Sequence, residues 1–246
     1  MSLRVLFLAG AIICTPASLS AQNFDFGINY AAGEVALNNS APFGNVSDAQ
    51  YQQVYAASVF GSDPVRLSEI QFQNLGYNYL PTTFSRLTIG LSTTNKNIGA
   101  LDLNFAANRG SDLTVLYDDT YIIDTTQPIS PTGFNLIFKL DQIFTYDPAD
   151  GNLLVDFTIT GVNGSGAPAL ASFQTGLSSR LVSFFPEASS GRADNYSLAT
   201  RFVSVPSVAA VPEPASWAMM LLGFGFVGGA LRSARIKRSK ITFATA

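Results

Sequence analysis

Apolar and polar residues alternate along several stretches between residues 22 and 210. In residues 134–140, FNLIFKL, every second side chain is apolar, and residues 87–91 and 153–159 show the same period of two. This period is typical of β-strands with one buried face, because successive side chains of a strand point to opposite sides. Further candidate strands are residues 23–30, 51–60, 65–73, 112–118, 180–186 and 197–205.

The order of these stretches predicts an all-β fold. Between Leu67 and Ile70 the apolar residues change parity, which predicts a β-bulge near Ser68 and Glu69. Gly, Asn, Asp and Pro cluster between the candidate strands as turn formers, and no stretch among them has sustained helical spacing. We therefore predict one antiparallel β-sandwich of jelly-roll type over residues 22–205.

The pattern changes near the C-terminus, where residues 215–231 form a run of 17 residues without a charge. As a helix with a rise of ~1.5 Å per residue, this run is about 25 Å long, which is marginal but sufficient to span a bilayer core. Trp217 at its start suits the membrane interface, and a basic cluster follows it. The cluster consists of Arg232, Arg235, Lys237 and Arg238. We predict a linker at 206–214, a transmembrane helix at 215–231 and a basic cytoplasmic tail at 232–246.

The same run contains GFGFVG, residues 223–228, which fits the G-x-G-x-x-G pattern of dinucleotide-binding sites. That pattern binds pyrophosphate only between a strand and a helix, with an acidic residue about 20 positions further on. No strand is predicted before it and no acidic residue follows Glu213. We therefore exclude a dinucleotide site here.

The N-terminus reads as a secretory signal peptide over residues 1–21. One positive charge in MSLR precedes an apolar run, and a proline and small residues follow it. Cleavage is expected near Ser20 and Ala21. Cys14, the only cysteine of the chain, would be removed with this peptide, so the mature protein would form no disulfides.

The segment from Gln22 to Val211 is long enough for one sizeable core. Of the 14 basic residues in the chain eight lie here, against 16 of its 17 acidic residues, which gives a net charge of −8. A surface of this charge repels nucleic acid, and no cluster of basic residues occurs within the segment.

The absence of histidine limits the kinds of catalytic and metal site that the chain can form. The chain has no histidine, so Ser-His-Asp and Cys-His catalysis and ordinary zinc sites are excluded in their usual forms. Paired carboxylates could still hydrolyse a glycosidic bond, although aspartates in such turns more often bond their own backbone. The candidate carboxylates are Asp118, Asp119, Asp124, Asp147 and Asp150. Residues 147–152, DPADGN, lack the ligand pattern of an EF-hand, so we assign no metal, no cofactor and no catalytic residue.

Sugar binding is a second alternative. Tyr77 and Tyr79 could offer flat rings to a polysaccharide, or they could equally cap the sandwich. The single tryptophan, Trp217, lies outside the predicted β domain and so supplies no stacking platform there. Residues 91–95 and 157–160 supply too few regularly spaced threonines for an ice-binding face.

The C-terminal segment VPEPASWAMMLLGFGFVGGALR with its basic cluster resembles the PEP-CTERM sorting signal of exported Gram-negative bacterial proteins, in its PEP-x-x-W-A variant. This tail is also catalogued as "ice-binding protein C-terminal domain". The resemblance covers residues 211 to about 238 and implies recognition of Pro212, Glu213 and Pro214 by an exosortase, a transpeptidase-like membrane enzyme. Six residues, ITFATA, extend beyond the length usual for such tails. On physical grounds the two prolines would hold Glu213 extended, and the alternative is an ordinary stalk before a permanent anchor.

The central part also resembles a recurring β domain of PEP-CTERM proteins. The resemblance is carried by QVYAASVFG, LTIGLSTT, LNFAANRG and FTYDPADGNLLVDF, within residues 53–157. It implies one exported β domain and supplies no catalytic residues.

Taken together, these features predict an exported protein. The precursor would sit in the inner membrane with its C-terminus inside, and the mature form would lie at the cell surface or outside the cell. We expect a non-catalytic structural or adhesive module linked to extracellular polysaccharide. The alternatives are a polysaccharide-active hydrolase and a carbohydrate-binding protein, which differ in whether two carboxylates converge in a groove.

Overall fold

The computed structural model describes residues 21–27, 37–39, 41–43, 48–75, 82–123, 133–163, 168–185, 187–206 and 213–239. Within the C-terminal helix it describes the side chains of residues 219–232. The predicted signal peptide lies outside this part of the chain, apart from Ala21. The chain divides into two compact units, residues 1–207 and 208–246.

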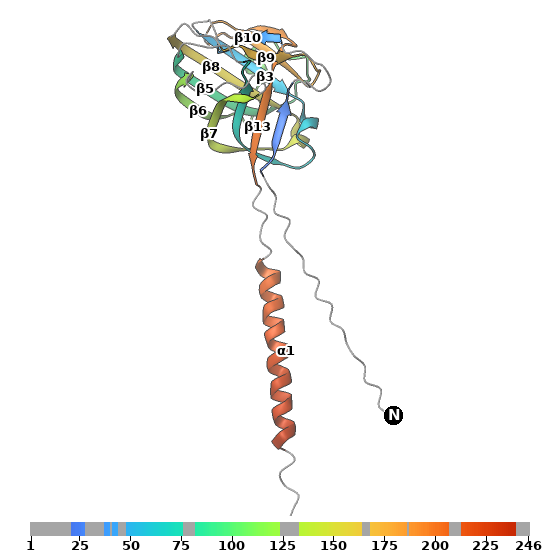
Figure 1. The fold of residues 1–246 in the computed structure, drawn as a ribbon. Coiled ribbons are helices and arrows are strands. Elements are labelled where there is room, and N and C mark those ends of the chain that lie inside the picture. Colours follow the sequence, from blue (N-terminus) through green and yellow to red (C-terminus); the bar gives the residue numbers. More distant parts are fainter. Residues whose placement is uncertain are drawn as a thin grey trace, which may run out of the picture. The chain divides into compact units, whose positions relative to one another are not determined.

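The first unit is built from antiparallel sheets, shown in Figure 1. A four-stranded sheet has the order β1-β13-β4-β7, a six-stranded sheet β11-β10-β3-β8-β5-β6, and a small third sheet β12-β9-β2. The strands are β1 (Asn23–Phe26), β2 (Leu37–Asn39), β3 (Ala49–Tyr55), β4 (Val65–Gln73), β5 (Thr82–Thr94), β6 (Thr114–Ile123), β7 (Phe134–Tyr146), β8 (Asn152–Asn163), β9 (Leu170–Phe173), β10 (Ser178–Ser183), β11 (Arg192–Asp194), β12 (Ser197–Leu198) and β13 (Thr200–Val205). Short 3₁₀ helices lie at η2 (Ala57–Val59), η3 (Phe105–Asn108) and η4 (Pro148–Asp150).

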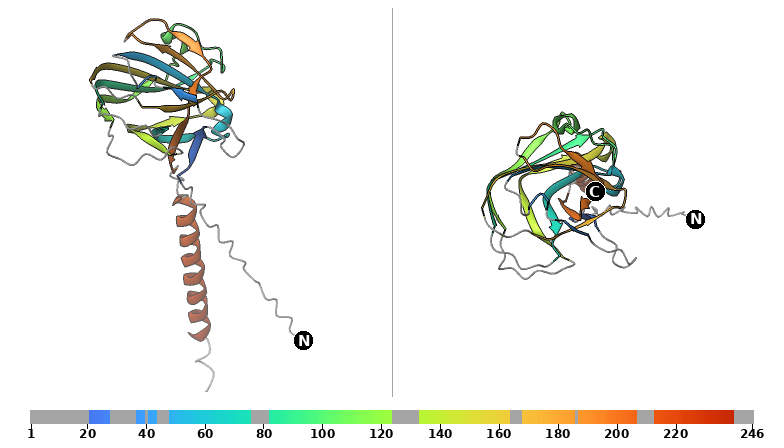
Figure 2. Two further views of the ribbon diagram at one scale, coloured as in Figure 1. Left: turned by 45° about the horizontal axis from the view of Figure 1, so that its top comes forward. Right: turned by 90° about the horizontal axis from the view of Figure 1, so that it is seen from above.

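Aromatic side chains join the four-stranded and six-stranded sheets. The ring of Tyr55 on β3 lies 4.8 Å from that of Phe26 on β1 and 4.8 Å from that of Phe202 on β13, centroid to centroid. Further along, Phe72 of β4 lies 5.7 Å from Phe157 of β8. Two views in Figure 2 show the layers from other sides. The predicted antiparallel β architecture is confirmed, whereas the jelly-roll connection stays a prediction.

The predicted period of two holds where one face of a strand meets the core. On β7 Leu136 and Phe138 are buried while Ile137 and Lys139 between them are exposed. The predicted bulge is also confirmed, because the pairing of β4 with β7 and with β13 shifts between Leu67 and Glu69. The hydroxyl of Ser68 donates to the carbonyl of Val203 at 3.2 Å across this bulge.

The sequence pattern predicted one strand over residues 51–60, and this prediction is wrong. Strand β3 ends at Tyr55, and η2 follows it. The chain turns here because the backbone N–H groups of Ala56 and Ala57 find partners outside a strand, the carbonyl of Leu177 at 2.8 Å and the side chain of Asn152 at 3.0 Å.

Strand β3 is buried on both faces along its whole length. A second apolar cluster covers the outer face of the six-stranded sheet, where Leu101 and Phe105 pack with Val54, Leu154 and Leu181. The segment that contains η3 therefore acts as a partial third layer. As a result β3 carries buried glutamines at positions that the alternation alone would place in water.

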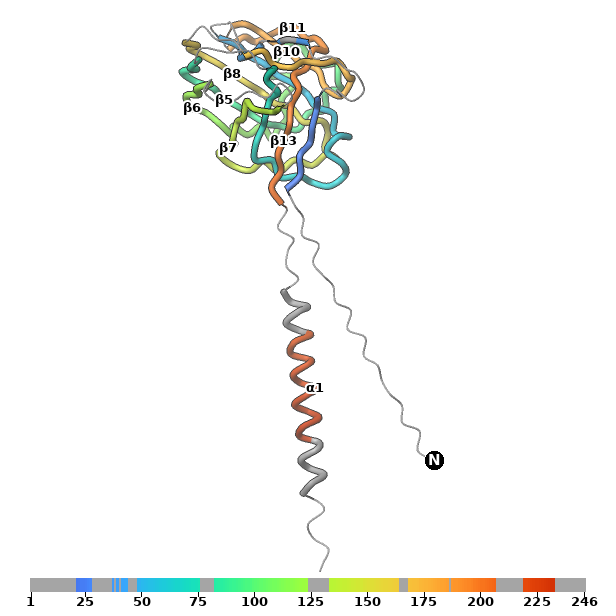
Figure 3. Tube along the Cα trace, in the orientation of Figure 1, coloured from blue at the N-terminus to red at the C-terminus, as the bar shows by residue number. Residues whose placement is uncertain are grey.

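The two ends of the first unit lie side by side. Strand β1 pairs with β13 in antiparallel fashion, with Phe24 opposite Phe202, and the trace in Figure 3 shows these two strands as neighbours. The described chain therefore enters this unit at Gln22 and leaves it at Pro206 at the same end of one sheet.

The second unit contains one helix, α1 (Glu213–Ser239). The predicted helix at 215–231 falls inside it. Within the part of the chain that the structure describes, no helix combines the length and apolar character needed to cross a membrane. The membrane-spanning part of the prediction is thus not confirmed.

Candidate functional site

The predicted sorting residues lie at the start of α1. Glu213 and Pro214 occupy its first turn and Trp217 its second, while Pro212 lies outside the described residues. The expectation that the prolines would hold Glu213 extended is therefore wrong. Proline is tolerated in a first turn, because the N–H that it lacks would have no intrahelical partner there. An acidic residue is also favoured at this end by the helix dipole.

The middle of α1 is apolar on every side. Four consecutive residues, Met219 to Leu222, are each between 55% and 72% exposed, and Phe224, Phe226 and Val227 continue the exposed run. Consecutive residues point around the whole helix, so no polar face remains in this stretch. A helix of this kind is normally covered by other protein or by lipid.

The basic cluster lies in the last turns of the same helix. Arg232, Arg235, Lys237 and Arg238 all precede its end at Ser239. Positive charge is favourable at a helix C-terminus, where the carbonyl groups have no intrahelical donors. One helix therefore joins two of the three PEP residues, Glu213 and Pro214, an apolar surface and a basic end in that order.

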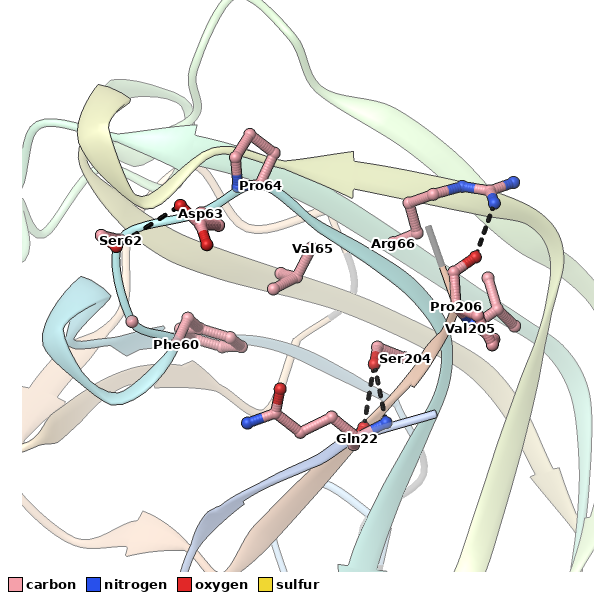
Figure 4. A pocket seen from close by; sticks show the side chains of 11 residues that line it. Gln22, Phe60, Ser62, Asp63, Pro64, Val65, Arg66, Ser204, Val205 and Pro206 are labelled. Atoms are coloured by element: carbon pink, nitrogen blue, oxygen red, sulfur yellow. Dashed lines mark hydrogen bonds between the residues drawn. The ribbon is translucent and has the colours of Figure 1, made fainter. Parts of the chain in front are cut away.

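The β unit has a pocket where the chain enters and leaves it, shown in Figure 4. The N–H of Gln22 donates to the hydroxyl of Ser204 at 3.1 Å, and the N–H of Ser204 donates to the carbonyl of Gln22 at 2.9 Å. Arg66 donates to the carbonyl of Pro206 at 3.0 Å. The pocket of about 450 Å³ lies between these contacts and residues 60–65. It is bordered by the predicted cleavage position near Ala21 and by the last residues before the predicted linker at 206–214.

The candidate carboxylate Asp118 is held in an exposed ion pair. Arg86 donates to its two oxygens at 2.7 and 2.8 Å, and Thr88 donates at 3.0 Å. These hydrogen bonds, that of Arg86 above all, lower the pKa of Asp118 to about 2. A carboxyl group with this pKa is ionised at neutral pH and has no proton to donate as a general acid.

The other candidate carboxylates are spread over the unit. Asp119 accepts from the N–H of Thr120 at 2.6 Å, and Asp124 lies outside the described residues. Asp147 accepts from the N–H of Ala149 at 2.9 Å and so caps η4. That contact confirms, for Asp147, the expectation that turn aspartates bond their own backbone.

Asp150 shares a polar pocket of about 470 Å³ with Asp112, which the sequence analysis did not single out. Both oxygens of Asp112 accept from the backbone N–H of Thr93 at 2.9 Å. Among the described residues, no group of three His, Cys, Asp or Glu side chains is placed to hold a metal ion.

A buried polar network, which sequence reasoning missed, ties η3 to the six-stranded sheet. The amide of Gln52 donates to Asp156 at 2.8 Å and accepts from Asn108 at 2.9 Å. Arg109 donates to the same Asp156 at 2.6 Å. The polar residues Asn108 and Arg109 are evident in the sequence, but their partners Gln52 and Asp156 lie far away along the chain and could not be inferred from it.

The predicted sugar-stacking residues Tyr77 and Tyr79 lie outside the described residues. The structure instead exposes two neighbouring aromatics in the loop between β10 and β11, Phe184 and Phe185, which are 50% and 74% exposed. Two phenylalanines next to a proline in an otherwise polar turn were the signal that could have identified them.

Residues 210–236 match the family model described as the PEP-CTERM protein-sorting motif. A search of curated proteins and a search of solved structures each found no match to this chain. The matched segment contains the PEP residues, the apolar stretch of α1 and part of the basic cluster. The chain therefore carries a PEP-CTERM protein-sorting motif at its C-terminal end.

Proposed function

We propose that this protein is exported, sorted by an exosortase-like membrane transpeptidase, and displayed as a non-catalytic structural or adhesive module in contact with extracellular polysaccharide. In this proposal the signal peptide is removed near Ser20 and Ala21, and the precursor is held at the inner membrane with its basic end inside. The transpeptidase then reads Pro212, Glu213 and Pro214 and releases the β domain to the cell surface.

One observation carries the sorting part: the motif match covers a helix whose middle, residues 219–227, is apolar on every side. Such a surface is stable only against lipid or against another apolar protein surface, and a membrane enzyme provides both. The position of Glu213 in the first turn adds a negative charge at the end of the helix where it is most favourable.

The non-catalytic part is supported by the use of the aspartates. Asp118 is clamped by Arg86, Asp147 caps η4, and Asp112 holds the backbone of Thr93. Each of these carboxylates stabilises its own surroundings, as expected for residues that build a module.

The sorting proposal is tested by replacing Glu213 with alanine in the native host. If an enzyme reads the PEP residues, Glu213→Ala should accumulate as full-length precursor in the membrane fraction, while the unchanged protein yields a shortened product. Replacement of the exposed Asp63 by alanine is the control, because it removes one acidic residue of the β unit that is not part of the motif and should leave processing unchanged. Immunoblots of membrane and medium fractions give the measurement.

The proposal fails if Glu213→Ala and the unchanged protein release the same product in equal amount. It also fails if neither is ever shortened, because the segment would then be a plain anchor. A joint replacement of Arg232, Arg235, Lys237 and Arg238 should instead disturb orientation, since little positive charge would remain at the C-terminal end.

A further inference from the structure

A groove lies on the outer face of the six-stranded sheet, beside the cap that contains η3. Its floor holds Gln50 of β3, Thr158 of β8 and Thr88 of β5, which the strand register places in one row. Their sequence neighbours Tyr51, Phe157 and Ile89 face the core, so the row points outward. The groove has a volume of about 530 Å³, within the range of about 300–1,000 Å³ usual for small-molecule sites.

Two segments far apart in the chain form the wall of this groove. Residues 104–106 form the N-cap and the first two residues of η3, and residues 187–189 belong to the loop between β10 and β11. The N–H of Phe105 donates to the carbonyl of Ser189 at 3.1 Å and joins them. Gln52 of β3 donates to the carbonyl of Phe105 at 2.9 Å, which ties the joined segments to the sheet below.

The polar side chains of the groove are held in place by partners around its edge. Arg86 is locked by Asp118 at one end, and Asp156 accepts from Arg109 at the other. When the amide of Gln50 is assigned from its neighbours, its nitrogen donates to the carbonyl of Ala188 at 2.7 Å and its oxygen accepts from Arg109 at 3.1 Å. A ligand would thus meet donors and acceptors whose orientation is already fixed, which lowers the entropic cost of binding.

Two groups of the groove remain available. Within the described part of the chain, the hydroxyl of Thr158 has no hydrogen-bond partner. The carboxylate of Glu187 forms no salt bridge there, although its charge contributes to raising the pKa of Arg86. Glu187 is also the one described residue other than glycine with a positive φ, 57°. Such strained backbone is found mainly where the surrounding structure imposes it, often at binding sites.

Charge indicates which class of ligand would fit. The lining carries two arginines and Glu187. Each arginine is paired with an aspartate just outside the lining, Asp118 or Asp156, so the five charges together sum to −1. An acidic ligand is therefore disfavoured, as it is by the net charge of −8 over residues 22–211. Fixed amide, hydroxyl and guanidinium groups suit a neutral molecule with many hydroxyl groups.

An apolar surface accompanies these polar groups. Phe184 and Phe185 are exposed in the same loop that supplies Glu187 and Ser189 to the wall. Neither ring lines the groove itself. The C–H face of a pyranose ring packs well on an aromatic ring, so a glycan that continues from the groove along this loop would find an apolar surface.

We propose that this groove binds neutral pyranose units of an extracellular polysaccharide. The inference rests on the proposed function, which places the β domain in contact with polysaccharide, and it names the part of the domain that makes the contact. Hydroxyl groups of one sugar would bond to Thr158, Thr88 and Glu187 in the groove, and the ring face of a neighbouring unit would lie against Phe185.

Binding of the full-length protein to soluble glycans tests this proposal. Affinity gels with mixed-linkage β-glucan, galactomannan or polygalacturonate compare two neutral probes with an acidic one. Thr158→Val keeps the size and strand preference of the side chain but removes its hydroxyl, and Phe185→Ala removes an exposed ring without touching the core. Thr145→Val on β7, an exposed position in the other sheet, is the matched control.

We expect retention on at least one neutral glycan, weakened about ten-fold by Thr158→Val and by Phe185→Ala and unchanged by Thr145→Val. If the unchanged protein binds a neutral glycan and both groove variants bind it equally well, the groove assignment is wrong and the proposed function stands. Retention on polygalacturonate alone would overturn the ligand class. If none of the three probes is retained, the contact with polysaccharide fails together with the groove, while the sorting step remains open to its own test.

Discussion

Two ion pairs of the β unit share one geometry and differ in their exposure to water. Arg180 donates to Asp194 at 2.7 and 3.1 Å, and their side chains are only 11% and 17% exposed. Arg201 donates two hydrogen bonds to Asp25, each at 2.7 Å, and their side chains are 30% and 44% exposed. Burial also raises the pKa of Tyr51, which packs beside Arg180. The first pair therefore carries a larger desolvation cost that only its partner offsets.

At the scale of the residue, we predict unequal effects from removing these two aspartates. Asp194→Ala leaves a buried guanidinium without its carboxylate and should lower the free energy of unfolding by about 3–5 kcal/mol. Asp25→Ala should lower it by about 0–1 kcal/mol, because water solvates the arginine that remains. Urea unfolding of both variants measures the difference, and equal losses would contradict the burial argument.

At the scale of the element, β1 depends on side chains more than on its own length. It has four residues, and among the described strands it pairs only with β13. Its two phenylalanines are buried, with the Phe26 ring 4.8 Å from that of Tyr55 and 5.4 Å from that of Phe60. The strand thus fastens the entry of the chain to the aromatic core.

We predict that Phe26→Ala lowers the free energy of unfolding by about 3–5 kcal/mol, the usual cost of emptying a buried phenylalanine site. Hydrogen exchange should also become faster at the N–H groups that β1 and β13 share. Asp25→Ala changes the outward face of the same strand and is the control. A loss no larger than that of Asp25→Ala would mean that the ring is not packed as described.

At the scale of the whole molecule, residues 22–206 should fold without the C-terminal unit and without disulfides. The sheets, their shared core and the cap over β3 all lie in the first unit, and the segment contains no cysteine. A fragment of these residues should give a circular dichroism spectrum dominated by β-structure, with a melting temperature unchanged by reducing agent. A strong helical signal, or a lower melting temperature on reduction, would count against one self-contained β domain.

The features that could be predicted from the sequence are those that depend on neighbouring residues within one stretch of the chain. The strands along 134–140 and 153–159, the bulge at Ser68 and the sorting motif each depend on spacing within one contiguous stretch, which strand geometry or a recognising enzyme reads directly. The predicted length of the strand at 51–60 was wrong because its end depends on a distant residue. The side chain of Asn152, 95 positions from Ala57, accepts the hydrogen bond that ends the strand.

Only the tertiary structure decided which polar residues act together. Gln52 is buried because η3 covers the outer face of β3, and its partners Asn108 and Asp156 lie 56 and 104 positions away. Asp118 became an ion-pair residue through Arg86, 32 positions earlier in the chain. The proposed sugar groove likewise combines three strands and two loops. Such contacts depend on register and layer packing, and no spacing along the chain encodes them.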